Sequence, residues 1–360
     1  MLCVFFPSLH TDKKYASKVT FRTSAAKPIF ILILSLAGLF MLDISMGSVS
    51  IPFGNVFSIL LGNAPNSVWG DIIWQFRFPK AITCILAGAA LSCSGLMMQT
   101  LFRNPLAGPD VLGLSSGASL LVAIVILAGA SGSSILFQIS TNPWSVAIAA
   151  SIGSIMVLIL VIIIAQKVRD NVSLLIIGLM LGAATSSLVS VLQFLSKAED
   201  LQAFMIWTLG SVGGTSWREI QVLSCILVAG ALIALQSMKS LNALLLGENY
   251  AQSLGIHIRR SRFWIVMATS IMAGGVTAFC GPIAFVGLAV PHLVRILIHT
   301  SNHKILIPAV MMGGASLILF CDILAQLPGS TQVLPLNAIT SLIGAPVVIW
   351  VVVRNKRKTF

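Results

Sequence analysis

Residues able to carry out chemistry are sparse in this chain, and their spacing builds none of the common catalytic or metal sites. The six cysteines form no Cys-x-x-Cys pair, and five lie in or beside apolar runs, which is typical of small core residues. His299 and His303 stand four apart in a short polar segment without an acidic or cysteine partner nearby, so we expect solvated loop histidines. The sequence therefore predicts no catalytic residue and no metal site.

A nucleotide site is also missing from the sequence. No Gly-x-x-x-x-Gly-Lys-Ser/Thr phosphate loop occurs, and no glycine is followed by lysine anywhere in the chain. His292, the histidine embedded in a long apolar run, has no carboxylate in the same segment. We therefore expect no enzyme activity and no cofactor bound by this chain. If ATP and magnesium supply the energy, a separate subunit must bind them.

The acidic residues bear on a second way of supplying energy. Ion-coupled carriers usually place carboxylates near the middle of the bilayer, where charge is costly to bury. The ten acidic residues of this chain lie at the ends of apolar runs or in loops, and Asp43 and Asp322 are the deepest, about one helical turn inside the boundary. We interpret both as helix-end partners, and an ion-coupled secondary transporter that uses one of them is the alternative.

The composition shows which elements must position these residues. Of the 360 residues 57% are hydrophobic and only 9% are charged, whereas soluble domains carry about 25% charged residues. Such a chain lacks the polar surface to stay dissolved, so the excess apolar surface must face lipid. The net charge of +12 is distributed between apolar runs, which is typical of topology signals rather than of a nucleic-acid-binding face.

Ten charge-poor stretches are long enough to cross a bilayer, which takes about 20 residues as a helix. The fold class is therefore an all-α integral membrane protein with ten transmembrane helices. The uncharged segment 201–217 is glycine-rich and short, and we expect it to be interfacial. The predicted spans are Ile29–Gly47, Ala81–Leu101, Val111–Ala130, Trp144–Gln166, Val172–Ser196, Ile220–Met238, Phe263–Phe279, Ile283–Ile298, Ile305–Cys321 and Pro335–Val353.

The basic residues orient these spans. With ten crossings, 18 of the 22 lysines and arginines fall on the side of the two termini and 4 on the other side. Because lysine and arginine concentrate in cytoplasmic loops, both termini are expected in the cytoplasm. Residues 1–27 then form a basic cytoplasmic tail, and residues 28–360 form one ten-helix domain.

A cytoplasmic segment at residues 240–256 is too short and too interrupted to span. Its apolar residues form two short stripes at helical spacing on either side of Gly247, namely Leu241, Leu244 and Leu245 before it, and Ala251 and Leu254 after it. A helix lying on lipid would favour lysine on its polar face, whereas this segment carries Glu248, Asn249 and Gln252. The pattern favours docking of a partner over the alternative of a lipid-bound loop.

Six motifs in sequence resemble one family of membrane proteins. They are FRFPK at 76–80, GAALSCSGLMMQ at 88–99, RNPLAGPDVLGLSSGAS at 103–119, LNALLLGENYAQSLGI at 241–256, GPIAFVGLAVPHLVR at 281–295 and LPLNAITSLIGAPVVIW at 334–350. Their order is that found in the FecCD-type permeases, the transmembrane subunits of ABC importers for iron-siderophores, haem and cobalamin. The resemblance as a whole covers about 320 residues and leaves out only the basic leader.

The resemblance implies a type II ABC importer permease fold in a prokaryotic cytoplasmic (inner) membrane. It implies a second permease copy, as a homodimer, with two ATP-binding subunits below and a soluble substrate-binding protein above. Membrane lipid would surround the assembly, and no nucleic acid would be involved. The cargo would be a metal chelate, and the motifs do not distinguish among an iron-siderophore, haem and cobalamin.

The resemblance also assigns roles to residues. The ATPase-coupling set would be Leu241, Leu244, Leu245, Gly247, Glu248, Ala251, Leu254 and Gly255. Arg77 and Lys80 would contact acidic residues of the binding protein, with interfacial anchoring beside Trp69 and Trp74 as the alternative. Relatives often carry a further basic residue where this chain has Gln326, so a third contact of that kind is in doubt.

Two further sets concern the transport pathway. By resemblance, Asn104, Leu106 and Ser173 would help to close a cytoplasmic gate, although a purely structural turn at Asn104–Pro109 explains the two prolines equally well. The residues expected to line the pathway are Ser186, Ser190, Gln193, Asn337, Thr340 and Ser341. The alternative for these polar residues is hydrogen bonding between helices. The pairs Gly113 with Gly117 and Gly178 with Gly182 are predicted to be helix-packing faces.

Overall fold

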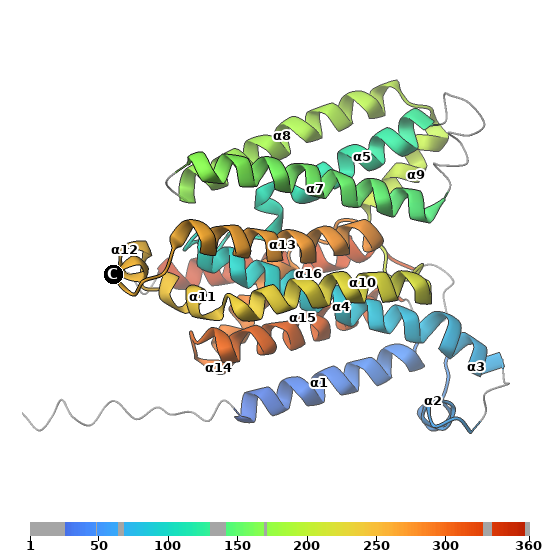
Figure 1. Ribbon diagram of the computed structural model, residues 1–360. Coiled ribbons are helices and arrows are strands. Elements are labelled where there is room, and N and C mark those ends of the chain that lie inside the picture. The colour runs from blue at the N-terminus through green and yellow to red at the C-terminus, as the bar shows by residue number, and fades with distance from the viewer. Residues whose placement is uncertain are drawn as a thin grey trace, which may run out of the picture.

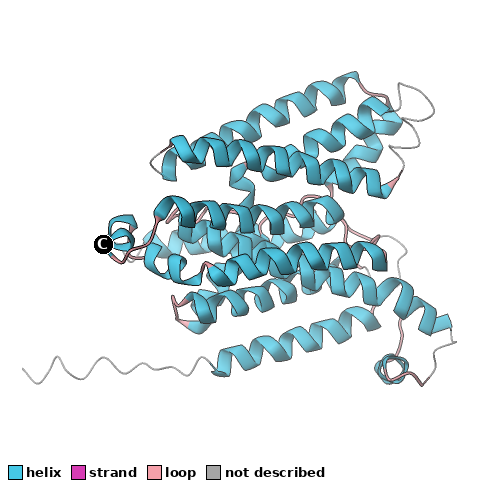
Figure 2. Ribbon diagram, viewed as in Figure 1, coloured by secondary structure: helices cyan, strands magenta, loops and turns pink. Residues whose placement is uncertain are grey.

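The computed structural model describes residues 26–47, 49–63, 68–129, 142–168, 171–326 and 333–356. Within these ranges the chain is helical, apart from loops and one isolated bridge between Gln326 and Val333 (Figure 2). Nearly all of the predicted N-terminal tail lies outside the described residues.

The helices follow the predicted spans closely, with short helices between them. The long elements are α1 (Ala26–Ser45), α4 (Phe78–Leu101), α5 (Leu114–Gly129), α7 (Pro143–Lys167), α8 (Asn171–Leu195), α10 (Trp217–Gln236), α13 (Ile258–Cys280), α14 (Val286–Ile298), α15 (His303–Ala325) and α16 (Leu336–Lys356). The short ones are α2 (Phe53–Leu60), α3 (Val68–Ile72), the π-helical turn η1 (Ile73–Arg77), the 3-10 turn η2 (Pro109–Leu112), α9 (Ala198–Thr208), α11 (Met238–Leu244) and α12 (Glu248–Ser253).

Seven of these helices are long and apolar enough to cross a membrane. Three shorter apolar helices, Leu114–Leu127, Val286–Ile298 and Leu336–Val351, coincide with the third, eighth and tenth predicted spans. The segment expected to be interfacial forms the 11-residue α9 followed by loop, and it adds no long apolar helix.

The helix α4 forms the centre of the bundle. It packs against α15, α13, α14 and α10, while α1 covers α15 (Figure 1). A second layer of α5, α7, α8 and α9 joins this core where α13 packs against α7 (Figure 1). The helices α1 and α8 are the least buried of the seven long apolar helices, so each leaves a broad apolar face uncovered.

Glycines allow the closest helix contacts. A Cβ atom added to Gly113 would lie 3.2 Å from the carbonyl oxygen of Gly178 and 3.3 Å from the amide of Gly182. One added to Gly117 would lie 2.7 Å from the carbonyl oxygen of Gly153 on α7, so the predicted packing role is confirmed, with α7 as the partner of Gly117. The core contains a tighter contact that the sequence analysis did not identify. There Gly95 of α4 lies directly against the backbone of Gly287 on α14, without room for a side chain.

Candidate functional site

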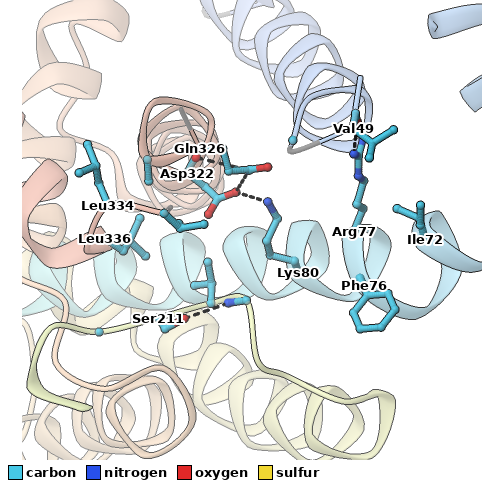
Figure 3. A pocket seen from close by; sticks show the side chains of 16 residues that line it. Val49, Ile72, Phe76, Arg77, Lys80, Ser211, Asp322, Gln326, Leu334 and Leu336 are labelled. Atoms are coloured by element: carbon cyan, nitrogen blue, oxygen red, sulfur yellow. Dashed lines mark hydrogen bonds and ion pairs between the residues drawn. The ribbon is translucent and has the colours of Figure 1, made fainter. Parts of the chain in front are cut away.

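A buried charge cluster joins three helices at the end of the bundle opposite the C-terminus. The Lys80 Nζ lies 2.6 Å from Asp322 Oδ2 on α15 and 3.7 Å from Asp43 Oδ1 on α1. Gln326 donates from Nε2 to Asp322 Oδ2 at 2.5 Å (Figure 3). The same Nε2 donates to Asp43 Oδ1 at 3.2 Å. The cluster therefore ties α1, α4 and α15 together, and both aspartates are helix-end partners as predicted.

Arg77 is positioned by an irregular turn. Pro79, which lacks an amide donor, is the second residue of α4. The five residues before α4 form the π-helical turn η1, a local widening that keeps α3 and α4 continuous. The guanidinium of Arg77 donates from Nη1 to the carbonyls of Ile44 and Ser45 at 2.8 and 2.9 Å, and from Nη2 to the carbonyl of Val49. It thereby satisfies backbone carbonyls at the C-terminal end of α1.

A cavity of about 460 Å³ opens beside these groups, lined by Arg77, Lys80, Asp322 and Gln326 among others (Figure 3). Arg77 and Lys80 are mostly buried and point toward their internal partners. Contact with a soluble protein would require both cations to leave these partners. Their docking role stays a prediction, whereas their role in holding α1 and α15 follows from the distances to their partners.

The same cluster offers candidate metal ligands. One ligand atom from each of Asp43, Cys84 and Asp322 lies within 4.8 Å of the others. However, the ammonium of Lys80 already lies against both carboxylates and supplies a positive charge there. The arrangement is therefore better suited to a permanent ion-pair network than to an exchangeable cation.

The loop after α4 has a defined shape at the opposite end of the bundle. The Asn104 Oδ1 accepts the amide of Leu106 at 2.9 Å, and the His292 Nε2 lies 2.8 Å from the carbonyl oxygen of Pro105. Leu106 is 45% exposed at the tip of this loop. His292 thus fixes the loop to α14.

His303 corrects one expectation from the sequence. It is fully buried rather than solvated, and its Nδ1 lies 2.8 Å from Asn242 Oδ1 on α11, while its Nε2 lies 3.0 Å from Thr100 Oγ1 on α4. His299, by contrast, is exposed at the C-terminal end of α14. The burial of His303 is not predictable from the local sequence, because its partners are 61 and 203 residues away.

The segment 240–256 forms two short helices, α11 and α12, that meet at Gly247, where φ is +111°. The stripe residues Leu241, Leu244 and Ala251 are buried within this chain, so they hold the segment on the bundle and present no open face. The exposed side chains lie on the other face, at Leu246 (63%), Tyr250 (52%) and Leu254 (57%).

Comparison with known proteins places the chain in a family. The model of the FecCD transport family matches residues 32–354. The chain belongs to this family. It is 38% identical over 285 residues to the vitamin B12 import system permease protein BtuC of Klebsiella pneumoniae, covering 79% of this chain and 83% of the relative. It is 32% identical over 315 residues to the hemin transport system permease protein HmuU of Yersinia pestis, covering 87% and 91%.

A solved structure has the same architecture. A protein described as a metal-chelate type ABC transporter, in an inward-facing conformation, matches with a TM-score of 0.77 and 28% identity, covering 91% of this chain and 99% of the other. Together with the seven long apolar helices, membership of the FecCD transport family makes this chain a multi-pass protein of the inner membrane.

The residues expected to line a pathway in this FecCD family member are not brought together within one chain. The helices α8 and α16 lie in different layers (Figure 1). Ser186 and Ser190 are exposed on α8, whereas Thr340 is buried and bonds to the carbonyl of Asn337 at 3.1 Å. Gln193 and Ser341 are half-buried, and Asn337 accepts the amide of Ala284 at 3.0 Å.

Ser173, the remaining predicted gate residue, is half-buried near the start of α8. Asn104 and Leu106 are joined by a hydrogen bond within their own loop. The helix α8 packs against the turn η2, which follows that loop, so the two parts of the predicted gate are neighbouring elements of the fold.

Proposed function

We propose that this chain is the transmembrane permease subunit of an ATP-driven importer whose cargo is a metal chelate of the iron-siderophore, haem or cobalamin type. The observation that carries the proposal is the family match over residues 32–354. It is supported by two permease relatives that match along most of their length and that serve vitamin B12 and hemin import.

The proposed topology has ten spans with both termini in the cytoplasm. Seven long apolar helices and three shorter ones give this count, and 18 of the 22 basic residues then lie on the terminal side. In this orientation the loop at Asn104–Pro109 and the pair α11–α12 are cytoplasmic, and the cluster around Lys80 lies near the outer surface.

A second copy of the chain would complete the pathway along α8. The exposed face of this helix carries the hydroxyls of Ser186 and Ser190 between large apolar side chains, which include Leu188, Val191 and Phe194. Because Thr340 and Asn337 are already engaged within the bundle, α8 is the better candidate for the surface that faces the cargo. A weakly polar lining suits a conduit that must release what it carries.

ATP and magnesium would be bound by two partner subunits that dock beneath α11 and α12, and a soluble binding protein would dock at the outer end. The exposed side chains Leu246, Tyr250 and Leu254 form the proposed ATPase contact. The buried residues Leu241 and Leu244 would transmit its motion, because they are packed into the same bundle that holds the gate loop.

Reconstitution in vesicles with the ATPase and the binding protein tests this proposal. We expect chelate uptake that requires ATP inside and persists when the proton gradient is collapsed. Tyr250→Asp with Leu254→Asp should lower both uptake and stimulated ATP hydrolysis at least tenfold, whereas Tyr250→Phe with Leu254→Met should retain both. Uptake that follows the proton gradient without the ATPase would instead support an ion-coupled carrier.

The structure gives a reason to prefer the first outcome. A carrier that uses Asp43 or Asp322 would need a carboxylate free to exchange its ion. Both carboxylates are held by Lys80 and Gln326, and Asp43 is fully buried. The network therefore favours a structural role for both residues.

A further inference from the structure

A basic cavity lies between the C-terminal end of α7 and the N-terminal end of α13. These two helix ends lie at the end of the bundle that carries the C-terminus (Figure 1). The volume of the cavity is about 560 Å³. Four of its seven lining residues are cationic, namely Lys167, Arg259, Arg260 and Arg262, and the other three are apolar, namely Ile162, Phe263 and Val266. A cavity with a cationic part and an apolar part fits an amphipathic ligand that has an anionic group and an apolar group.

Three of the four cations have no acidic partner among the described residues. Arg262 donates to the carbonyl of Val168 at 3.1 Å and pairs with Glu248 at 3.5 Å, so it fastens α13 to the end of α7 and to α12. Among the described residues no carboxylate lies within 4 Å of the nitrogens of Lys167, Arg259 or Arg260, and all three side chains are exposed. Like charges gathered without a counter-ion attract an external anion.

The position of this cavity is that of a membrane surface. Arg259 and Arg260 occupy the first turn of the apolar helix α13, whose N-terminal dipole adds positive potential. Trp264, one turn further, is 40% exposed, and its ring packs edge-on against Phe263 with centroids 5.3 Å apart. An exposed tryptophan beside arginines at a helix end is typical of the headgroup level of a bilayer.

A second, separate cavity lies further along the same two helices, toward the middle of the bundle. One and two turns beyond Ile162 and Val266, this cavity of about 220 Å³ lies between α7, α10 and α13. It is lined by small residues and by the aliphatic side chains Ile155, Leu158, Ile226 and Ile271. From Val266 to Gly274, which lines this cavity, the rise of a helix is about 12 Å, a length suited to part of an acyl chain.

We infer that the α7–α13 face is a binding site for an anionic phospholipid, with its phosphate at Lys167, Arg259 and Arg260 and one acyl chain along Ile162, Leu158 and Ile155. Basic cavities between transmembrane helices favour such headgroups, and each cation near the surface contributes about a fivefold gain in binding. This site is separate from the proposed gate and from the exposed face of α12. It does not depend on the identity of the cargo.

Native mass spectrometry of the purified full-length chain tests the inference. The probes are phosphatidylglycerol and phosphatidylcholine with identical acyl chains. We expect the wild-type chain to retain phosphatidylglycerol in large excess, and Arg259→Gln with Arg260→Gln to lower its affinity roughly thirtyfold, to the level of phosphatidylcholine. The matched control is Lys239→Gln with Lys304→Gln, which removes two exposed cations from the same end of the bundle and should change little.

Two results would overturn the inference. Equal loss of phosphatidylglycerol in the control pair would mean that net charge, rather than this cavity, retains the lipid. Unchanged lipid retention in the Arg259/Arg260 pair, together with weaker binding of the ATPase, would assign these arginines to a protein contact.

A further arm of the experiment adds glycerol phosphate, which has the headgroup chemistry of the lipid without its acyl chains. It should fail to displace the lipid at equal concentration, and displacement would remove the second cavity from the site.

Discussion

The side chain of Asn242 on α11 is joined to that of His303 at the start of α15. The Asn242 Oδ1 accepts the backbone amide of His303 at 2.9 Å and lies 2.8 Å from its Nδ1. The other ring nitrogen lies 3.0 Å from the hydroxyl of Thr100, one residue before the end of α4. A single buried imidazole thus connects the proposed ATPase contact to the helix that leads into the proposed gate.

Replacing Asn242 should weaken this connection. In Asn242→Leu the buried imidazole loses an acceptor, which costs about 1–3 kcal/mol of stability. We expect a lower thermal unfolding temperature and, in reconstituted vesicles, a several-fold fall in chelate uptake per ATP hydrolysed. The control Asn249→Leu removes an exposed amide from the neighbouring helix α12 and should leave the unfolding temperature unchanged. An unchanged ratio of uptake to hydrolysis in Asn242→Leu would contradict a coupling role.

Lys80 should be essential for the stability of the outer cluster. Lys80→Met leaves the carboxylates of Asp43 and Asp322 buried without their cation, and loss of one partner of a buried pair costs about 3–5 kcal/mol. We expect a large fall in unfolding temperature, measured in detergent. Adding Asp322→Leu to Lys80→Met should recover part of the loss. The exposed lysine Lys197, changed to Met, provides the control.

The spans were predictable because charge-free runs of about 20 residues have few other uses. The packing role of Gly113 and Gly178 was likewise predictable, because each is followed by a second glycine four residues later and small residues at that spacing allow close helix contacts. The surface against which the apolar stripe of α11 packs was not predictable in the same way. A stripe such as Leu241, Leu244 and Leu245 has the same spacing whether it packs on its own bundle or on a partner, and only the tertiary structure shows that two of the three are buried.

The polar contacts escaped prediction for a related reason. His303 pairs with residues 61 and 203 positions away, and a single sequence contains no signal for such distances. The asparagine at 242, inside an otherwise apolar stripe, was the one local hint that a polar partner lay on that face. For Lys80, the hint was the pair of deep carboxylates at Asp43 and Asp322, which require a cation when buried.

Gly95 should tolerate no side chain. In Gly95→Ala the new methyl group would overlap the backbone of Gly287, so α4 and α14 would have to separate. Overpacking of this kind costs about 1–3 kcal/mol or more. We expect a lower unfolding temperature, whereas Gly38→Ala on α1, where nothing lies within 4 Å, should raise it slightly or leave it unchanged. Equal unfolding temperatures for the two variants would contradict the close packing of α4 on α14.

The proposed second copy can be tested with one cysteine on α8. In a C2 dimer the same surface of both subunits meets at the axis, so a residue near that axis lies close to its own counterpart. With Cys3 and Cys225 changed to serine, we expect Ser190→Cys to form a cross-linked dimer under mild oxidation in membranes. Ile155→Cys, which is also exposed but lies on α7, should stay monomeric on a denaturing gel. Efficient cross-linking at Ile155 without any at Ser190 would move the subunit contact from α8 to α7. The serines of α8 would then face lipid rather than cargo.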